Sequence, residues 1–255
     1  MKKYLVIITG EAFRKGGYHC RKRDKPGSIP DQLKASESQM DFLNFISKKF
    51  DMGYDVSLNC YKSIYIEQLL NIYQPLYDNT NKYPEAWKQK KQTLQAIKDI
   101  PDLYVYESVL ILRVDLIIKE YFWRVFDPLC EKIMFPCIMH TSYCKVRNTD
   151  LPRVVDTFMF IPKKQFDNIR SRQIWDIAIH TSYFYCIEGG LSHSDLGFYS
   201  NTYHDSNTQH CWNPMYTICN RPVSTSWPDN NKHYNEYNEI INSPNATIKA
   251  LYGKF

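Results

Sequence analysis

Ser108-Val-Leu-Ile-Leu-Arg-Val-Asp-Leu-Ile-Ile-Lys119 is an apolar run into which two charged residues, Arg113 and Asp115, are set. The run follows a Pro101-Asp102 turn signal, so it predicts a central β-strand covered on both faces. Side chains alternate along a strand, and the two charges are therefore expected on one face. A buried carboxylate must be paired or hold a metal. Two interpretations stay open: a structural Arg113–Asp115 ion pair, or an acid at the carboxyl end of a strand, where α/β sheets bind ligands.

Composition indicates one globular domain. The chain has 255 residues, of which 44% are hydrophobic and 23% are charged, and its net charge is +5. This mild positive balance suits a small phosphate-bearing ligand better than a long nucleic-acid duplex, so we expect no DNA partner. Eight cysteines occur without a Cys-x-x-Cys pair, which argues against a zinc ribbon and leaves disulfides and free thiols both open.

The amino-terminal apolar run predicts a first strand at Tyr4 to Ile8. It is too short for a signal peptide, and Glu11 and Arg14 follow it at once. No later segment approaches the roughly 18 apolar residues that span a bilayer. We therefore expect a cytoplasmic protein, in the host cytoplasm if the source is viral, without a membrane span.

A basic loop follows this first strand and reads Thr9-Gly-Glu-Ala-Phe-Arg-Lys-Gly-Gly17. Backbone N–H groups and the guanidinium of Arg14 in such a loop can bind a phosphate. The loop matches neither a Walker A motif nor Gly-x-Gly-x-x-Gly, so by itself it does not identify a nucleotide.

Helices and strands alternate along the first half of the chain, which favours an α/β fold. Helices are predicted at 31–50, with Asp31 as N-cap, and at 64–73 and 83–100, with a strand at 54–60 between the first two. The second half predicts a strand at 132–140, placed at a sheet edge because of Pro136. Further predicted elements are a short helix at 121–126, a strand at 153–162 entered by Asp156, and helices at 163–172 and 173–187.

Five short motifs together resemble GT-A-type glycosyltransferases, close to small sugar transferases of large DNA viruses and bacteria. They are Ile8-Thr-Gly-Glu-Ala-Phe-Arg14, Ile111-Leu-Arg-Val-Asp-Leu116, Asp156-Thr-Phe-Met-Phe-Ile-Pro162, and the pair His204-Asp-Ser-Asn207 and Asn213-Pro-Met-Tyr216. The resemblance implies a GT-A-like, Rossmann-like fold with a mixed, mostly parallel sheet flanked by helices and an irregular carboxyl-terminal region. It also implies one domain over 1–255, with nucleotide-sugar binding in 1–120 and acceptor binding in 121–255.

The resemblance further implies a hexosyl- or pentosyltransferase that takes a UDP- or GDP-linked sugar to a glycan or glycoprotein acceptor. In such enzymes an Asp-x-Asp element binds Mn²⁺ or Mg²⁺ on the diphosphate; here the place reads Arg113-Val-Asp115, so Arg113 could bind the diphosphate directly. Asp115 and His204 are the expected metal ligands, and Asp156 is the candidate base for an inverting reaction. The expected nucleotide-sugar-binding residues are Thr9, Gly10, Glu11, Arg14, Arg113 and Asp115.

Several alternatives remain open at this point. A retaining reaction would need no such base, and neither the donor sugar nor the oligomeric state follows from the sequence. A metal-dependent phosphoesterase using Asp115, Asp156 and Asp205 is a second enzyme class. A non-catalytic module that binds carbohydrate or nucleic acid through its aromatic, basic surface is the third.

Overall fold

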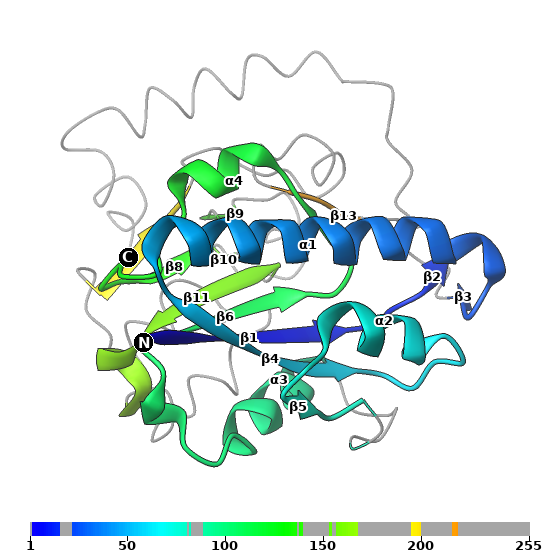
Figure 1. Cartoon of the computed structure of the whole chain (residues 1–255), viewed down its shortest axis with the longest axis horizontal. Coiled ribbons are helices and arrows are strands. Elements are labelled where there is room, and N and C mark those ends of the chain that lie inside the picture. The colour runs from blue at the N-terminus through cyan, green and yellow to red at the C-terminus, as the bar shows by residue number, and fades with distance from the viewer. Residues whose placement is uncertain are drawn as a thin grey trace, which may run out of the picture.

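A seven-stranded sheet between two layers of helices forms the centre of the molecule (Figure 1). The structure is a computed structural model that describes residues 2–15, 22–80, 82, 89–136, 138–139, 153–154, 157–167, 195–199 and 216–218. Within these ranges the strands run in the order β12-β8-β11-β6-β1-β4-β5.

The first half of the chain builds the parallel side of this sheet. Strand β1 (Lys3–Gly10) lies between β4 (Gly53–Cys60) and β6 (Ser108–Arg113) and is parallel to both, and β5 (Tyr77–Asp78) continues this side beyond β4. Between these strands run the helices α1 (Ile29–Phe50), α2 (Ile66–Tyr73) and α3 (Gln89–Lys98). The short elements are β2 (Arg14–Lys15), β3 (Lys22–Arg23), η1 (Pro26–Ser28) and η2 (Leu103–Val105).

The second half adds one antiparallel strand and two further strands to the sheet. Strand β11 (Phe158–Pro162) is antiparallel to β6 and to β8 (Ile133–Phe135), and β12 (Leu196–Phe198) is parallel to β8. The remaining elements are β7 (Leu116–Ile118), α4 (Glu120–Val125), β9 (Ile138–Met139), β10 (Arg153–Val154), η3 (Lys163–Gln165) and β13 (Tyr216–Ile218). The sheet is thus mixed and mostly parallel, which confirms the fold class expected from the sequence.

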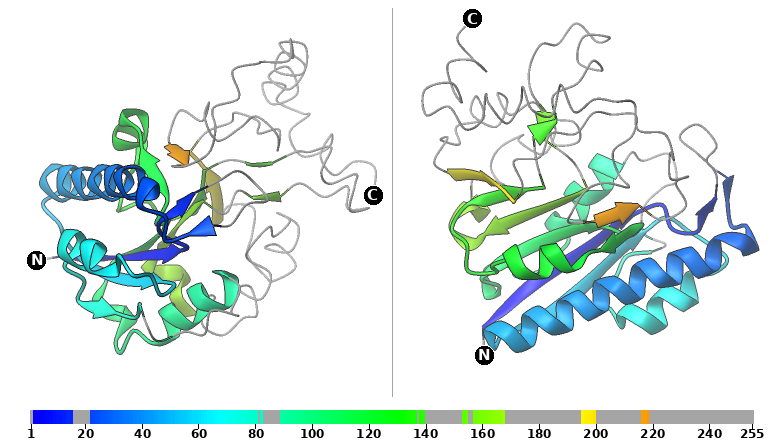
Figure 2. Two further views of the ribbon diagram at one scale, coloured as in Figure 1. Left: turned by 90° about the vertical axis from the view of Figure 1, so that its right-hand side faces the viewer. Right: turned by 90° about the horizontal axis from the view of Figure 1, so that it is seen from above.

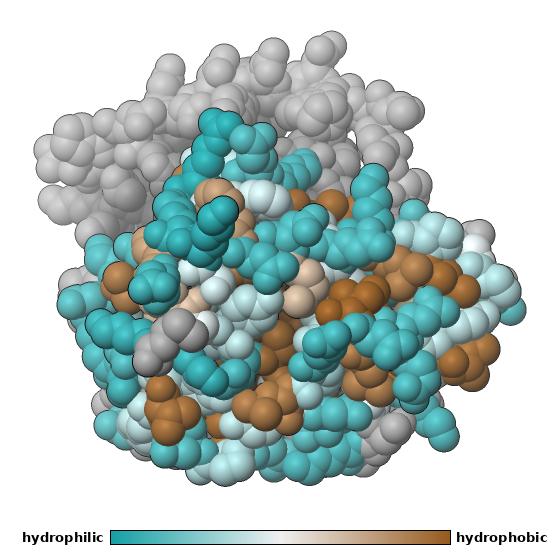
Figure 3. Space-filling view, in the orientation of Figure 1, coloured by the Kyte–Doolittle hydropathy of each residue, from teal (hydrophilic) through white to brown (hydrophobic). Residues whose placement is uncertain are grey.

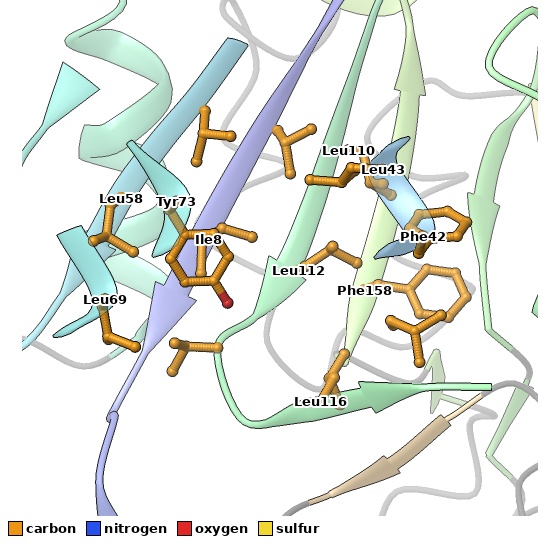
Figure 4. Close-up of a cluster of buried hydrophobic side chains, with 14 of the residues drawn as sticks. Ile8, Phe42, Leu43, Leu58, Leu69, Tyr73, Leu110, Leu112, Leu116 and Phe158 are labelled. Atoms are coloured by element: carbon orange, nitrogen blue, oxygen red, sulfur yellow. The ribbon is translucent and has the colours of Figure 1, made fainter. Parts of the chain in front are cut away.

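The two faces of the sheet carry separate apolar cores because strand side chains alternate. Helices α1, α2 and α4 lie on one face of the sheet (Figure 2). Phe42, Leu69 and Phe122 of these helices are fully buried there, and Figure 4 shows Phe42 and Leu69. On the other face Ala96 and Ile97 of α3 pack against Leu5, Ile7 and Ile111. Strand β6 is therefore covered on both sides, as its unbroken apolar sequence predicts.

Three details differ from the sequence-based expectations. The strand predicted over 108–119 ends at Arg113, because the chain turns at Val114 and Asp115 and then forms β7, which leaves the main sheet and pairs with β13. Helix α1 begins at Ile29, so Asp31 lies in its first turn and is not the N-cap. Strand β8 lies between β11 and β12 and not at an edge; Pro136 follows its last residue, so the proline removes no hydrogen bond from that strand.

Other predicted elements lie where the sequence places them. The helices and strand expected at 31–50, 54–60, 64–73 and 121–126 correspond to α1, β4, α2 and α4. Only part of the helices expected at 83–100 and 163–172 is described, and the helix expected at 173–187 lies outside the described residues.

The surface that carries α1 and α2 mixes polar and apolar side chains (Figure 3). Among the described residues the large exposed apolar side chains include Ile64, Leu76 and Leu129. No helix in the described part of the chain is both long and apolar enough to cross a bilayer.

Candidate functional site

The candidate site lies at the carboxyl ends of β1 and β6, where the order of the strands reverses. After β1 the chain passes through α1 to β4 and through α2 to β5 on one side, and it then returns through α3 to β6 on the other side of β1. In open α/β sheets ligands bind in the crevice at such a reversal. Thr9 of β1 is aligned with Arg113 of β6, so the two chain segments that leave this edge begin side by side.

Arg113 and Asp115 form a paired fork at this edge. Arg113 Nε donates to Asp115 Oδ1 at 3.0 Å and Nη2 donates to Oδ2 at 2.6 Å. Their side chains are only 12% and 9% exposed. The ion-pair interpretation of the sequence is therefore confirmed, although the pair forms across a turn and not along one face of a strand. A planar guanidinium fixed in this way is suited to binding a carboxylate or phosphate.

The loop after β1 brings a second cation to the same edge. Gly10 has a φ of 119°, a conformation that side-chain-bearing residues rarely adopt, and a Cβ at this position would lie 3.8 Å from Val114 Cγ1. Glu11 and Arg14 follow and form an ion pair, with 3.1 Å between Arg14 Nε and Glu11 Oε2. The turn after β6 contacts the end of β1 directly, because Val114 N donates to Thr9 O at 2.9 Å.

Thr9 is buried under α3, with its side chain turned away from this loop. Its Oγ1 lies 3.3 Å from Thr93 Oγ1 of α3, and it is 1% exposed. On β4, Asn59 Nδ2 donates to the Ser57 hydroxyl at 2.9 Å, and Asn59 Oδ1 accepts from Asn79 Nδ2 at 3.0 Å. Thr9, Asn59 and Asn79 at the ends of three neighbouring strands and Thr93 of α3 therefore form a buried polar layer next to the edge that carries Arg113.

One buried amide of α3 is unsatisfied. Neither polar atom of the Gln92 side chain has a hydrogen-bond partner within the described part of the chain, and the residue is 0% exposed. Buried polar groups without partners are rare in native proteins and commonly mark a place for a water or a ligand.

Cys60 at the end of β4 lies in the same electrostatic environment. Burial, followed by the negative charges of Asp115 and Asp78, raises the pKa of its thiol well above the ordinary range. The thiol therefore stays protonated and unreactive at neutral pH.

A divalent cation does not fit the donor set that the described residues present. Both oxygens of Asp115 accept hydrogen bonds from Arg113, and a metal bound to them would lie against a guanidinium of the same charge. Within the described ranges no three acidic, histidine or cysteine side chains come together in a way that would hold a metal. Hard cations bind best where several carboxylates converge, and Arg113 occupies that position at this edge.

The described binding residues named from the sequence lie on or after β1 and β6. Thr9 and Gly10 end β1, Glu11 follows it, Arg14 begins β2, Arg113 ends β6 and Asp115 lies in the turn after it. Asp156, Asp205 and His204 lie outside the described residues.

Sequence reasoning missed two buried glutamines of α1, Gln32 and Gln39, that hydrogen-bond to the same loops. The available signal was their spacing. Seven residues apart, they share the helix face of the buried Ala35 and Phe42, where apolar residues are expected.

Comparison with known proteins finds likenesses of fold alone. No protein family and no curated protein matches the sequence. A structure described as a nucleotide-diphospho-sugar transferase from Desulfovibrio desulfuricans G20 aligns over 80% of this chain and 81% of that one, with 11% identity and a TM-score of 0.44. A glycosyltransferase involved in glycosylation of the major capsid of PBCV-1 aligns over 94% and 98%, with 10% identity and a TM-score of 0.40.

A third likeness is to a Drosophila β1,4-galactosyltransferase 7 mutant in complex with manganese, UDP-Gal and xylobiose. It aligns over 91% of this chain and 79% of that one, with 10% identity and a TM-score of 0.38. At these identities and TM-scores, none of the three likenesses assigns a donor, an acceptor or a metal to this chain.

Proposed function

We propose that the protein is a nucleotide-sugar transferase that moves a sugar from a nucleotide-diphosphate sugar to a hydroxyl acceptor. The observation that supports this most is the Arg113 guanidinium, held by Asp115 at the strand-order reversal of an α/β sheet. Arg14 on the neighbouring loop supplies a second positive charge. Two guanidinium groups at one site are suited to binding a diphosphate, because each can form paired hydrogen bonds with phosphate oxygens.

The chemistry of sugar transfer requires positive charge at this place. As the bond between the anomeric carbon and the phosphate oxygen breaks, negative charge accumulates on the leaving nucleoside diphosphate. A fixed guanidinium that faces this oxygen stabilises the transition state more than the ground state, because the charge develops only as the bond breaks. In this proposal Arg113 and Arg14 take the electrostatic role that a metal ion has in other transferases.

The remaining parts of the proposal follow from the sequence. One domain over 1–255 would bind a UDP- or GDP-linked donor through residues 1–120 and a glycan or glycoprotein acceptor through 121–255. For an inverting hexosyl or pentosyl transfer, Asp156 would accept the proton of the acceptor hydroxyl. His204 would lie near the diphosphate as the resemblance to GT-A enzymes implies.

A donor-hydrolysis assay tests the proposal. The protein is incubated with UDP-, GDP-, dTDP- and CMP-linked sugars, and the release of free nucleotide is followed. We expect turnover with one nucleotide family and its loss in the double variant Arg113→Met/Asp115→Leu, which leaves neither buried charge unpaired. Arg124→Met is the matched control, because Arg124 is an exposed arginine whose ion pair with Glu120 lies on α4. This control should retain the wild-type rate.

Two results would contradict the proposal. Binding of a nucleotide-sugar or glycan without any turnover would favour the non-catalytic module. Release of phosphate from simple phosphate esters, with no preference for nucleotide-sugars, would favour the phosphoesterase.

A further inference from the structure

Two glutamines of α1 are fully buried against the loops that carry the proposed site. Gln32 and Gln39 are 0% exposed and lie two helical turns apart on the same face of the helix. Figure 1 shows that α1 runs lengthwise over the sheet and that its first turns extend past the ends of β1 and β6. Buried amides are costly unless their hydrogen bonds are made, so the partners of these two side chains indicate their role.

Gln39 holds the turn between β6 and β7. Its amide nitrogen donates to the carbonyl oxygens of Arg113 at 3.1 Å, Leu116 at 2.8 Å and, more weakly, Val114 at 3.4 Å. Its amide oxygen accepts from the Tyr73 hydroxyl at 2.9 Å. Carbonyl oxygens in a turn accept few hydrogen bonds from neighbouring strands. Here the side-chain amide of Gln39 supplies those hydrogen bonds instead.

Gln32 joins this turn to the loop after β1. Its amide nitrogen donates to Val114 O at 2.8 Å, and its amide oxygen accepts from Phe13 N at 3.2 Å. Val114 lies between Arg113 and Asp115, and Phe13 directly precedes Arg14. One side chain is therefore hydrogen-bonded to both segments that carry the guanidinium groups.

The Phe13 end of this bridge is strained. Phe13 has a φ of 54°, in the left-handed region that residues with a side chain seldom adopt. Ser28 Oγ and Asp24 N both donate to its carbonyl oxygen, at 2.9 Å and 3.1 Å. Backbone strain persists only where the surroundings fix it, and Gln32 is one of the groups that do so.

From these contacts we infer that Gln32 and Gln39 are positioning residues that fix the separation of Arg113 and Arg14 before a diphosphate binds. This inference rests on the proposed function. A diphosphate-binding pair of guanidinium groups gains affinity when its geometry is set in advance, because less conformational freedom is lost on binding. The inference therefore predicts a specific loss for the diphosphate part of a ligand.

The test compares each nucleoside diphosphate with its own nucleoside. The dissociation constants of UDP and uridine, and of the GDP, dTDP and CDP pairs, are measured by titration calorimetry on the wild type, Gln32→Met and Gln39→Met. Methionine keeps the length and volume of glutamine and removes the amide. Ile46→Val, on the same buried face of α1 away from the turn, controls for a general loss of stability.

We divide the dissociation constant of the nucleoside by that of its diphosphate. We expect this ratio to fall about tenfold in each glutamine variant, which corresponds to the loss of one hydrogen bond between a guanidinium and the diphosphate. Ile46→Val should keep the wild-type ratio, because a change that only lowers the stability of the fold affects the binding of nucleoside and diphosphate equally. If the wild-type ratio is well above one and both glutamine variants keep that ratio, this inference alone is overturned. A wild-type ratio near one would overturn the proposed function and this inference with it.

Discussion

Arg113 and Asp115 are two residues apart and form a two-bond fork across the turn between β6 and β7, with distances of 3.0 and 2.6 Å. The turn makes this fork possible, because neighbouring residues on the same face of an extended strand would point their side chains in parallel. The end of β6 and the turn after it therefore fix the guanidinium at the edge of the sheet.

Loss of one partner of this fork should destabilise the fold strongly. Arg113→Met leaves the 7%-exposed Asp115 without its cation, and we expect the free energy of unfolding to fall by about 3 kcal/mol. The double variant Arg113→Met/Asp115→Leu removes both charges and should recover most of that loss, since apolar pairs often replace buried ion pairs without penalty. Urea unfolding of the wild type and both variants measures this. Equal stability of the single and double variants would show that the pair carries no buried charge.

Binding of a nucleoside diphosphate should not require a divalent cation. Asp115 is already paired with Arg113, so a metal would have to displace the guanidinium first. We expect the same dissociation constant in excess EDTA and in excess Mn²⁺ or Mg²⁺. Affinity that appears only with metal would mean that Asp115 leaves Arg113 when the ligand arrives, and it would restore the metal site expected from the resemblance.

Gly10→Ala should be destabilising through backbone strain and not through a clash. The φ of 119° lies where an L-residue is strained, whereas the added Cβ would meet Val114 Cγ1 at an ordinary 3.8 Å. We expect the free energy of unfolding to fall by about 1–3 kcal/mol. If the strain account holds, Val114→Ala in the Gly10→Ala background will not restore stability, and a recovery by this second change would indicate steric crowding instead.

Stability should fall at alkaline pH because of two buried groups. Burial raises the pKa of Cys60 and of Tyr4 above their ordinary values, with smaller contributions from Asp115 and Asp78 at Cys60 and from Tyr54 at Tyr4. Both groups are neutral when protonated, and in the unfolded chain they ionise from about pH 8.5 and about pH 10 respectively. The unfolded state then binds fewer protons than the folded state. The free energy of unfolding should therefore be level up to about pH 8 and fall above it, by at most about 1.4 kcal/mol per pH unit for each group.

Urea unfolding at a series of pH values checks this for Cys60. Cys60→Ala should remove the part of the decline that begins near the ordinary thiol pKa of about 8.5. An unchanged decline in the variant would mean that the Cys60 thiol is not held protonated by the fold.

Periodic apolar patterns predicted most of the sheet-forming half of the chain. Apolar residues of helix α1 recur with a period of about 3.6 and those of strand β4 with a period of 2, because both elements pack against the core. The break after Arg113 was not predictable in this way. Val114 and Leu116 are as apolar as the strand before them and no glycine or proline marks the turn, which is held instead by Gln32 and Gln39 from a distant part of the chain.

The site was predictable only to the extent that sequence neighbours form it. Arg113 and Asp115 were recognisable because a charge within an apolar run must be paired or functional. The hydrogen bond from Val114 N to Thr9 O depends on the neighbouring places of β1 and β6 in the sheet, and so does the bridge from Gln32 to both segments. Such relationships need the tertiary fold, and no local pattern records them.

Titration calorimetry of nucleoside diphosphates against the wild type and Arg113→Met/Asp115→Leu tests the central claim most directly. The claim places the diphosphate at Arg113, at the edge of the sheet where β1 and β6 end. It predicts that the wild type binds one nucleoside diphosphate, and that the folded double variant binds it at least about tenfold more weakly, because a charge-assisted hydrogen-bonding fork has been removed. Equal affinity of the two proteins, or no binding of any nucleoside diphosphate by the folded wild type, would contradict the account.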